Sequence, residues 1–238
     1  MNAVRSLAFN LAFYLWTLLA AIVCMPLLLA PYPVAQATLN TWAKVVTWLL
    51  RVVGGVRVEV RGLEHLPKGK ALLAPKHQCM FDIFGTIAVL PAGCYVLRKE
   101  LMRIPVFGWW AAKCHMIVID REGGAKALRS MLADSAGRLE EADRQIVIFP
   151  EGTRGKPGQA GTYQPGVAAI YNHLDLPCTP VALNSGVHWQ KGGMSLKPGA
   201  IVFEFLEPLP AGMKRAAFMQ ALEERLEAAS NALIAEGI

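Results

Sequence analysis

Hydrophobic positions are unevenly distributed along the chain. Residues 7–30 include no charged side chain and very few polar ones. As a single helix, this stretch would extend about 36 Å, enough to cross the hydrocarbon core of a bilayer. We expect Pro26 to kink the helix and Pro31 with Pro33 to end it. A cleaved signal peptide is the alternative, but the apolar run is too long and no small-residue cleavage site precedes the prolines.

The next stretch, residues 34–53, has the periodicity of an amphipathic helix. Its apolar side chains recur at helical spacing: Trp42, Val45, Val46, Leu49, Val52 and Val53. The polar side chains expected on the opposite side are Gln36, Asn40, Lys44, Thr47 and Arg51. Such a helix can form a hairpin with the first, lie in the membrane interface or cover a globular core. We therefore predict a membrane-associated helical hairpin over 1–53 and a second domain over 54–238.

From residue 54 onward, short apolar runs alternate with helical segments. The run VRVEVRG at 56–62 alternates strictly between apolar and polar residues, as expected for a half-buried strand. Further strands are predicted at 70–76, 94–100, 115–121, 144–152, 178–184 and 200–207. Helices are predicted at 82–90, 125–142 and 165–174, and along the apolar stripe of Phe218, Leu222, Leu226, Ala229 and Leu233. This order predicts an α/β fold with a mixed, largely parallel sheet flanked by helices.

Composition and charge favour a membrane over a nucleic acid as the partner. Hydrophobic residues make up 54% of the chain, above the usual share of a soluble domain. The net charge is +6, and residues 1–100 account for all of it, with 10 Lys and Arg against 4 Asp and Glu. A basic, apolar N-terminal part is expected to face anionic lipid. The five cysteines are scattered without a CxxC pair, which predicts a reduced, cytosol-facing domain without structural zinc or disulfides.

Polar side chains follow the predicted strands where each one ends. His77 comes after the strand at 70–76, Arg121 ends the strand at 115–121, and Glu151 with Arg154 lie at the end of the strand at 144–152. Asn184 ends the strand at 178–184. In open α/β sheets, ligands bind beyond the carboxyl ends of the strands. We therefore expect these loops to form one site.

The segment KHQCMFD at 76–82 contains two candidate reactive pairs. His77 with Cys79 would be a thiol nucleophile and its base, but side chains two positions apart do not normally face each other. His77 and Asp82 would diverge by about 140° on a continuous helix. They meet only if a turn separates the strand from a helix that opens at Asp82. In that case Asp82 could also be a helix N-cap and nothing more.

The segment does not stand alone. Together with FPEGTR at 149–154, KHQCMFD resembles the glycerolipid acyltransferase family, specifically its 1-acylglycerol-3-phosphate acyltransferases. The blocks RKELMRIPVFGWW at 98–110, HMIVIDR at 115–121 and LPCTPVALNSG at 176–186 are similar to the family's other blocks. The resemblance covers about residues 56–207. The hydrophobic N-terminal hairpin also suits this family.

Two positions depart from the family pattern. Lys76 stands before His77, where many members carry asparagine, and this change leaves the histidine–aspartate pair intact. The segment YQPG at 163–166 stands where a lysine is often found. A phosphate contact from that loop is therefore not predicted.

The resemblance implies acyl transfer from a thioester, acyl-CoA or acyl-ACP, to the sn-2 hydroxyl of lysophosphatidic acid, which gives phosphatidic acid. His77 would remove the proton of the acceptor hydroxyl, and Asp82 would orient the imidazole. The attacking oxygen then belongs to the lipid, so Cys79 need not react.

The remaining motif residues are expected to hold the acceptor. Arg154 would bind its phosphate, with Arg121 as a second candidate. Gly152 would let the backbone approach the ligand closely, and Thr153 offers a hydroxyl. Glu151 would bind the glycerol or orient an arginine; its structural alternative is an ion pair with Arg154. Two further candidates for phosphate contacts, which could equally be solvated, are Arg98 and Lys99.

No cofactor and no metal are expected. The expected partners are membrane lipids, lysophosphatidic acid and the acyl thioester, on the cytoplasmic face of a bacterial inner membrane. The alternatives are an acyltransferase for another lysolipid or an amino lipid, and a non-catalytic membrane protein that binds lipid. A hydrolase is disfavoured because no G-x-S-x-G motif occurs. The oligomeric state is not predicted.

Overall fold

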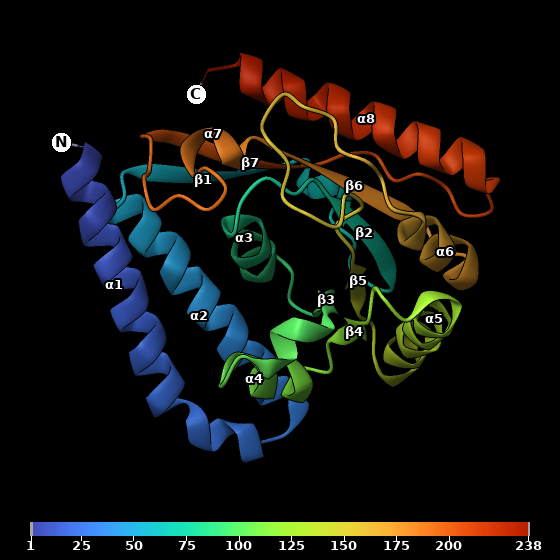
Figure 1. The fold of residues 1–238 in the computed structure, drawn as a ribbon, viewed down its shortest axis with the longest axis horizontal. Coiled ribbons are helices and arrows are strands. Elements are labelled where there is room, and N and C mark those ends of the chain that lie inside the picture. Colours follow the sequence, from blue (N-terminus) through green and yellow to red (C-terminus); the bar gives the residue numbers. More distant parts are fainter. Residues whose placement is uncertain (1, 238) are drawn as a thin grey trace.

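Two long helices precede a seven-stranded sheet that is interleaved with further helices (Figure 1). The structure, a computed structural model, describes residues 2–237. The strands are β1 (Val56–Arg61), β2 (Ala71–Pro75), β3 (Gly93–Arg98), β4 (Ile117–Ile119), β5 (Gln145–Val147), β6 (Cys178–Leu183) and β7 (Gly199–Phe205). The helices are α1 (Asn2–Val23), α2 (Tyr32–Val52), α3 (Phe81–Val89), α4 (Phe107–Lys113), α5 (Gly124–Glu141), α6 (Pro165–Leu174), α7 (Ser185–His188) and α8 (Arg215–Ala235). Three short 3-10 helices are η1 (Met25–Leu29), η2 (Leu63–His65) and η3 (Lys99–Arg103).

The sheet is mixed and largely parallel, as predicted. Its strand order is β1-β7-β6-β2-β5-β3-β4, and only β6 and β7 run antiparallel to each other. Five neighbouring strands, from β6 to β4, therefore end at the same edge. The predicted strand at 144–152 is shorter than expected, because β5 ends at Val147 and a turn closed by the N–H of Gly152 on the carbonyl of Phe149 follows.

Alternating residues of the strands face two different cores. On β2, Leu73 belongs to a cluster that includes residues of α1 to α4, whereas Leu72 and Ala74 belong to a cluster with α5, α6 and α8. Figure 1 shows these two groups of helices on opposite sides of the sheet. The side-chain period of two along a strand produces this division. The sheet is therefore buried on both faces, as expected for parallel strands.

The predicted single helix over 7–30 is wrong beyond Val23. α1 ends at Val23, and the chain continues as the 3-10 helix η1. Pro26 causes the change, because a proline has no N–H to donate to the preceding turn of an α-helix. Pro31 lies at the break before α2, as expected, and Pro33 lies in the first turn of α2, where its missing N–H is tolerated.

The predicted faces of α2 also need correction. Gln36 and Asn40, expected on the polar side, are buried. The amide of Gln36 donates to Oδ1 of Asn40 at 2.8 Å, and Nδ2 of Asn40 donates to the carbonyl of Leu90 at 2.8 Å. Asn40 thereby satisfies a carbonyl at the end of α3. Val52, expected to be packed, is instead exposed.

α1 packs through one face and exposes the other. Phe9 and Phe13 are buried in the core, while apolar residues on the remaining surface are exposed, including Leu7, Leu11, Leu15, Leu18 and Ile22. Within residues 2–237, α1 is the one helix that is long and apolar enough to cross a membrane. The division of the chain at residue 53 stays a prediction, although the two N-terminal helices share a core with the sheet.

The loop after α7 binds α1 by polar contacts. Nδ2 of Asn10 donates to the carbonyl of Met194 at 2.7 Å, and the N–H of Leu196 donates to Oγ of Ser6 at 2.9 Å. The ring of Phe9 packs edge-on against Trp189, with 5.4 Å between the centroids. α1 is therefore attached to the loop through both hydrogen bonds and aromatic packing.

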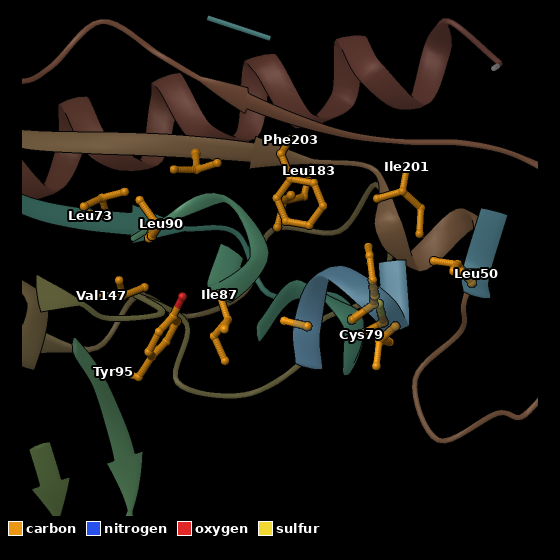
Figure 2. Packing of buried hydrophobic residues seen from close by; sticks show 14 of the residues in the cluster. Leu50, Leu73, Cys79, Ile87, Leu90, Tyr95, Val147, Leu183, Ile201 and Phe203 are labelled. Carbon is orange, nitrogen blue, oxygen red and sulfur yellow. The ribbon is translucent and has the colours of Figure 1, made fainter. Parts of the chain in front are cut away.

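α3 lies close to the sheet because it carries Gly85. A Cβ atom at this position would lie 2.1 Å from Cζ of Phe203 on β7. Phe203 is fully buried, and Figure 2 shows its ring among the packed side chains between sheet and helix. The ring cannot move aside without displacing its neighbours.

We expect Gly85→Ala to lower the free energy of unfolding by about 1–3 kcal/mol, because overpacking outweighs the better helix propensity of alanine. The matched control is Gly137→Ala on α5, where a Cβ would meet no atom within 4 Å. This second change should raise stability by about 0.5–1 kcal/mol. Denaturant unfolding of the two variants in the same detergent measures both effects. Equal shifts of the same sign would contradict the close contact at Gly85.

Candidate active site

The predicted convergence of strand ends is present. Four strands lie next to one another in the parallel part of the sheet, in the order β6, β2, β5 and β3. Their carboxyl ends therefore lie along one edge. His77 follows β2, Glu151 follows β5 and Ser185 follows β6. Contacts between these three loops, described below, place them in one site.

Asp82 holds the turn between β2 and α3. Its Oδ2 accepts hydrogen bonds from the main-chain N–H groups of Gln78 at 2.6 Å and Cys79 at 2.8 Å, and from Nδ1 of His77 at 3.0 Å. Its Oδ1 accepts a hydrogen bond from the hydroxyl of Ser185. The carboxylate is fully buried, so this set of donors replaces the water that it has lost.

The interpretation of Asp82 as an N-cap alone is wrong. α3 begins at Phe81, one residue earlier than predicted, and no side chain caps its first turn. The carboxylate instead bonds backward to the turn that precedes the helix. The bend that brings His77 to Asp82 is therefore made by the residues between them.

The imidazole of His77 is fixed in orientation. Nδ1 bonds to Asp82, which leaves Nε2 available to a substrate. The ring stacks on Phe149 with 4.2 Å between centroids. The main chain of His77 is also held on both sides, because its N–H donates to Oε2 of Glu151 at 3.0 Å and its carbonyl accepts the N–H of Gly155 at 2.7 Å. A side chain that is 12% exposed can still meet a ligand.

Cys79 is placed as a core residue. It is fully buried in the cluster of Figure 2. Burial raises the pKa of its thiol well above the ordinary value, and the neighbouring carboxylate of Asp82 raises that pKa further. Because the thiolate is the nucleophilic form, this cysteine is poorly suited to attack. The structure therefore favours the pairing of His77 with Asp82.

Glu151 binds Lys76 rather than an arginine. Nζ of Lys76 donates to Oε1 of Glu151 at 2.7 Å, and both side chains are buried. The ion pair of Glu151 with Arg154, considered as the structural alternative, is absent from the contacts of residues 2–237. Lys76 also donates to Glu227 of α8. Sequence reasoning treated Lys76 only as a departure from the family pattern and did not identify Glu227.

Two arginines meet at the turn that contains Gly152. Arg98 donates to the carbonyl oxygen of Gly152 at 3.1 Å, and Arg121 donates to the same oxygen. Partial loss of hydration at Arg121 and repulsion by Arg98 lower the pKa of Arg121. Both side chains are exposed. Two cations beside a single carbonyl form a surface that can bind an anion.

Gly152 and its neighbours have different surroundings. Gly152 has a φ of 64°, and a Cβ there would lie 2.7 Å from the guanidinium of Arg121, so the position requires glycine. Thr153 is exposed, and Arg154 is half-buried. Lys99 lies in an exposed ion pair with Asp120 at 2.8 Å, which agrees with the alternative that it is solvated.

A large apolar cavity lies beside the turn. Its volume is about 620 Å³. It is lined by Met80 and Ile83, which flank Asp82 along the chain, and by apolar residues of α1, α2, β3, η3 and α4. Sequence reasoning did not locate this cavity, because its lining comes from six separate stretches without a common motif. Ser185, also missed, could have been found by the strand-end rule, since only Asn184 separates it from the end of β6.

Within residues 2–237 no group of three or more His, Cys, Asp or Glu side chains is arranged to hold a metal ion.

Comparison with known proteins relates this geometry to a family. A family model described as Acyltransferase matches residues 57–184, which include His77, Asp82 and the turn after β5. The 1-acyl-sn-glycerol-3-phosphate acyltransferase of Pseudomonas aeruginosa is 37% identical over 162 residues, 68% of this chain and 63% of the relative. The enzyme of the same name from Limnanthes douglasii is 30% identical over 76% of this chain and 65% of its own length. The chain thus spans less than two thirds of the length of these relatives.

The fold has a counterpart among solved structures. The crystal structure of the 1-acyl-sn-glycerophosphate acyltransferase from Thermotoga maritima aligns with a TM-score of 0.81. The alignment covers 99% of this chain and 98% of the other, at 22% sequence identity. Since the family model matches more than half of the 238 residues, the chain belongs to the acyltransferase family.

Proposed function

We propose that this protein transfers a fatty acyl group from an acyl thioester to the sn-2 hydroxyl of 1-acylglycerol-3-phosphate, which yields phosphatidic acid. The observation that carries the proposal is the buried contact of 3.0 Å between Nδ1 of His77 and Asp82 in a chain of the acyltransferase family. The names of the relatives from Pseudomonas aeruginosa and Limnanthes douglasii support the choice of acceptor.

The reaction needs a base, and His77 is positioned for this role. Nε2 accepts the proton of the acceptor hydroxyl as its oxygen attacks the thioester carbonyl. Asp82 stabilises the imidazolium that forms, because its carboxylate is bonded to Nδ1. When the tetrahedral intermediate collapses, the carbon–sulfur bond breaks, and the imidazolium returns the proton to the thiolate. No covalent acyl-enzyme forms, so no protein nucleophile is required.

The surroundings of the pair suit the two substrates. The cavity of about 620 Å³ is lined almost entirely by apolar side chains and can accept a fatty acyl chain. Arg98 and Arg121 present two guanidinium groups beside Gly152, and Arg154 follows in the same loop. Guanidinium groups bind phosphate oxygens by charge-assisted hydrogen bonds. We assign the acceptor phosphate to this arginine surface.

The proposed membrane association rests on the exposed apolar face of α1. The exposed apolar side chains of α1 form a continuous face along the helix, and contact of such a face with water is unfavourable. We place this face in lipid, on the cytoplasmic side of a bacterial inner membrane, where thioester donors are made. The lipid acceptor can then reach the site from the bilayer.

The reaction is tested by thiol release from acyl-CoA with detergent-solubilised protein. Lysophosphatidic acid, other lysolipids or no acceptor are added, and mass spectrometry identifies the product. We expect thiol release that depends on lysophosphatidic acid and forms phosphatidic acid. Acyl-ACP replaces acyl-CoA if the latter is inert. Release without an acceptor, or with other lysolipids alone, would contradict the proposed acceptor.

The roles of His77 and Asp82 are tested by substitution. We expect His77→Ala and Asp82→Asn to lower kcat by about 10²- to 10⁴-fold, because the base or its orientation is lost. Cys79→Ala should keep kcat within a few-fold of the wild type, provided that circular dichroism shows a folded protein. A folded Cys79→Ala variant without activity would revive the thiol as the nucleophile.

The arginine surface makes a separate prediction. Loss of one charged hydrogen bond to phosphate costs about 1.5–3 kcal/mol, so Arg121→Gln should raise KM for lysophosphatidic acid by about 10- to 100-fold. The KM for the thioester should stay unchanged. Arg129→Gln, an exposed arginine on α5, is the control and should change neither constant. An unchanged acceptor KM in Arg121→Gln would place the phosphate elsewhere.

A further inference from the structure

A buried charged network lies behind the candidate active site. Lys76 is the first residue after β2, and its side chain is 2% exposed. Its ammonium donates to Oε1 of Glu151 at 2.7 Å and to Oε1 of Glu227. The hydroxyl of Tyr163 donates to the same oxygen of Glu227 at 3.0 Å. None of these contacts belongs to the proton transfer described above.

The network has one cation for two carboxylates. The side chains of Lys76, Glu151 and Glu227 are 2%, 1% and 15% exposed, so water screens their charges poorly. Burial and the carboxylate of Glu227 raise the pKa of Tyr163, which keeps its hydroxyl protonated as a donor. Removal of Lys76 would therefore leave two carboxylates near each other without a cation among the contacts of residues 2–237.

Through Glu151 the network reaches the histidine. Oε1 of Glu151 accepts from Lys76, while Oε2 accepts the main-chain N–H of His77. The loop after β5 closes around this carboxylate, since a Cβ on Gly161 would lie 2.7 Å from Oε1 of Glu151. The lysine thus fixes one oxygen of a carboxylate whose other oxygen fixes the main chain of His77.

We propose that Lys76 is a positioning residue, which holds Glu151 against the main chain of His77 and is itself bound by Glu227 of α8. The role in catalysis rests on the proposed function. The role in positioning does not, because it concerns the order of two loops and can be measured without turnover.

The test uses Lys76→Met, Glu227→Gln and the double variant, with Glu223→Gln as the control. Glu223 is an exposed glutamate one turn earlier on the same helix. We expect Lys76→Met to lower kcat by about 10- to 100-fold at unchanged KM, because small displacements of a catalytic group have effects of this size. Glu227→Gln should keep kcat within about threefold, since the bond from Lys76 to Glu151 remains.

The double variant separates positioning from charge balance. Removal of both Lys76 and Glu227 charges leaves one buried carboxylate, so Tm should recover most of the loss seen in Lys76→Met. The kcat should stay low, because Glu151 still lacks its anchor. Recovery of kcat together with Tm would show that Lys76 only balances the charge of Glu227, and the proposal would be wrong. The double variant also serves as the test if Lys76→Met does not fold.

Hydrogen exchange provides the readout that needs no activity. Peptides that cover 76–82 and 149–156 should exchange faster in the double variant than in the wild type. In Glu223→Gln, the exchange rates of the same peptides should equal those of the wild type. Unchanged exchange in both loops would overturn the positioning role. If the wild type shows no acyl transfer with any donor or acceptor while both loops exchange faster in the double variant, the proposed function fails and the positioning role stands.

Discussion

The geometry of the site depends on one buried carboxylate. Asp82 is removed from water and must be satisfied by protein donors, and the main chain of Gln78 and Cys79, the ring of His77 and the hydroxyl of Ser185 supply them. To supply these donors, the chain has to turn sharply between β2 and α3. The same requirement therefore creates the bend and brings an imidazole five positions earlier into contact with the carboxylate. Stability of the fold and orientation of the imidazole share one cause.

The parallel strands of the sheet position the other loops of the site. Because neighbouring strands end at one edge, the turn after β5 reaches His77 from the side and fixes both its N–H and its carbonyl. Two guanidinium groups are held beside the carbonyl of Gly152 by the ends of β3 and β4. Their mutual repulsion is unfavourable in the free protein, and a bound anion would relieve it. The two guanidinium groups are thus held in place without a bound anion.

The sequence correctly predicted those elements that depend on residues close together along the chain. The strict alternation at 56–62 correctly indicated a strand, and the helix predicted at 82–90 matches α3 to within one residue at each end. The burial of Gln36 and Asn40 could not be predicted, because it depends on the carbonyl of Leu90, 50 residues from Asn40. Glu227 is 151 residues from Lys76. In the sequence it is one of three glutamates near the middle of α8, and only the packing of the helix selects it.

The attachment of α1 to the loop after α7 has a mechanical consequence. Ser6 and Asn10 bond to main-chain groups of that loop, and α7 begins with Ser185, which bonds to Asp82. A short series of contacts therefore joins the first helix to the carboxylate that orients His77. A surface that fixes the depth of α1 would also fix the height of the imidazole above that surface. The position of α1 and the orientation of His77 are thus linked through the loop after α7.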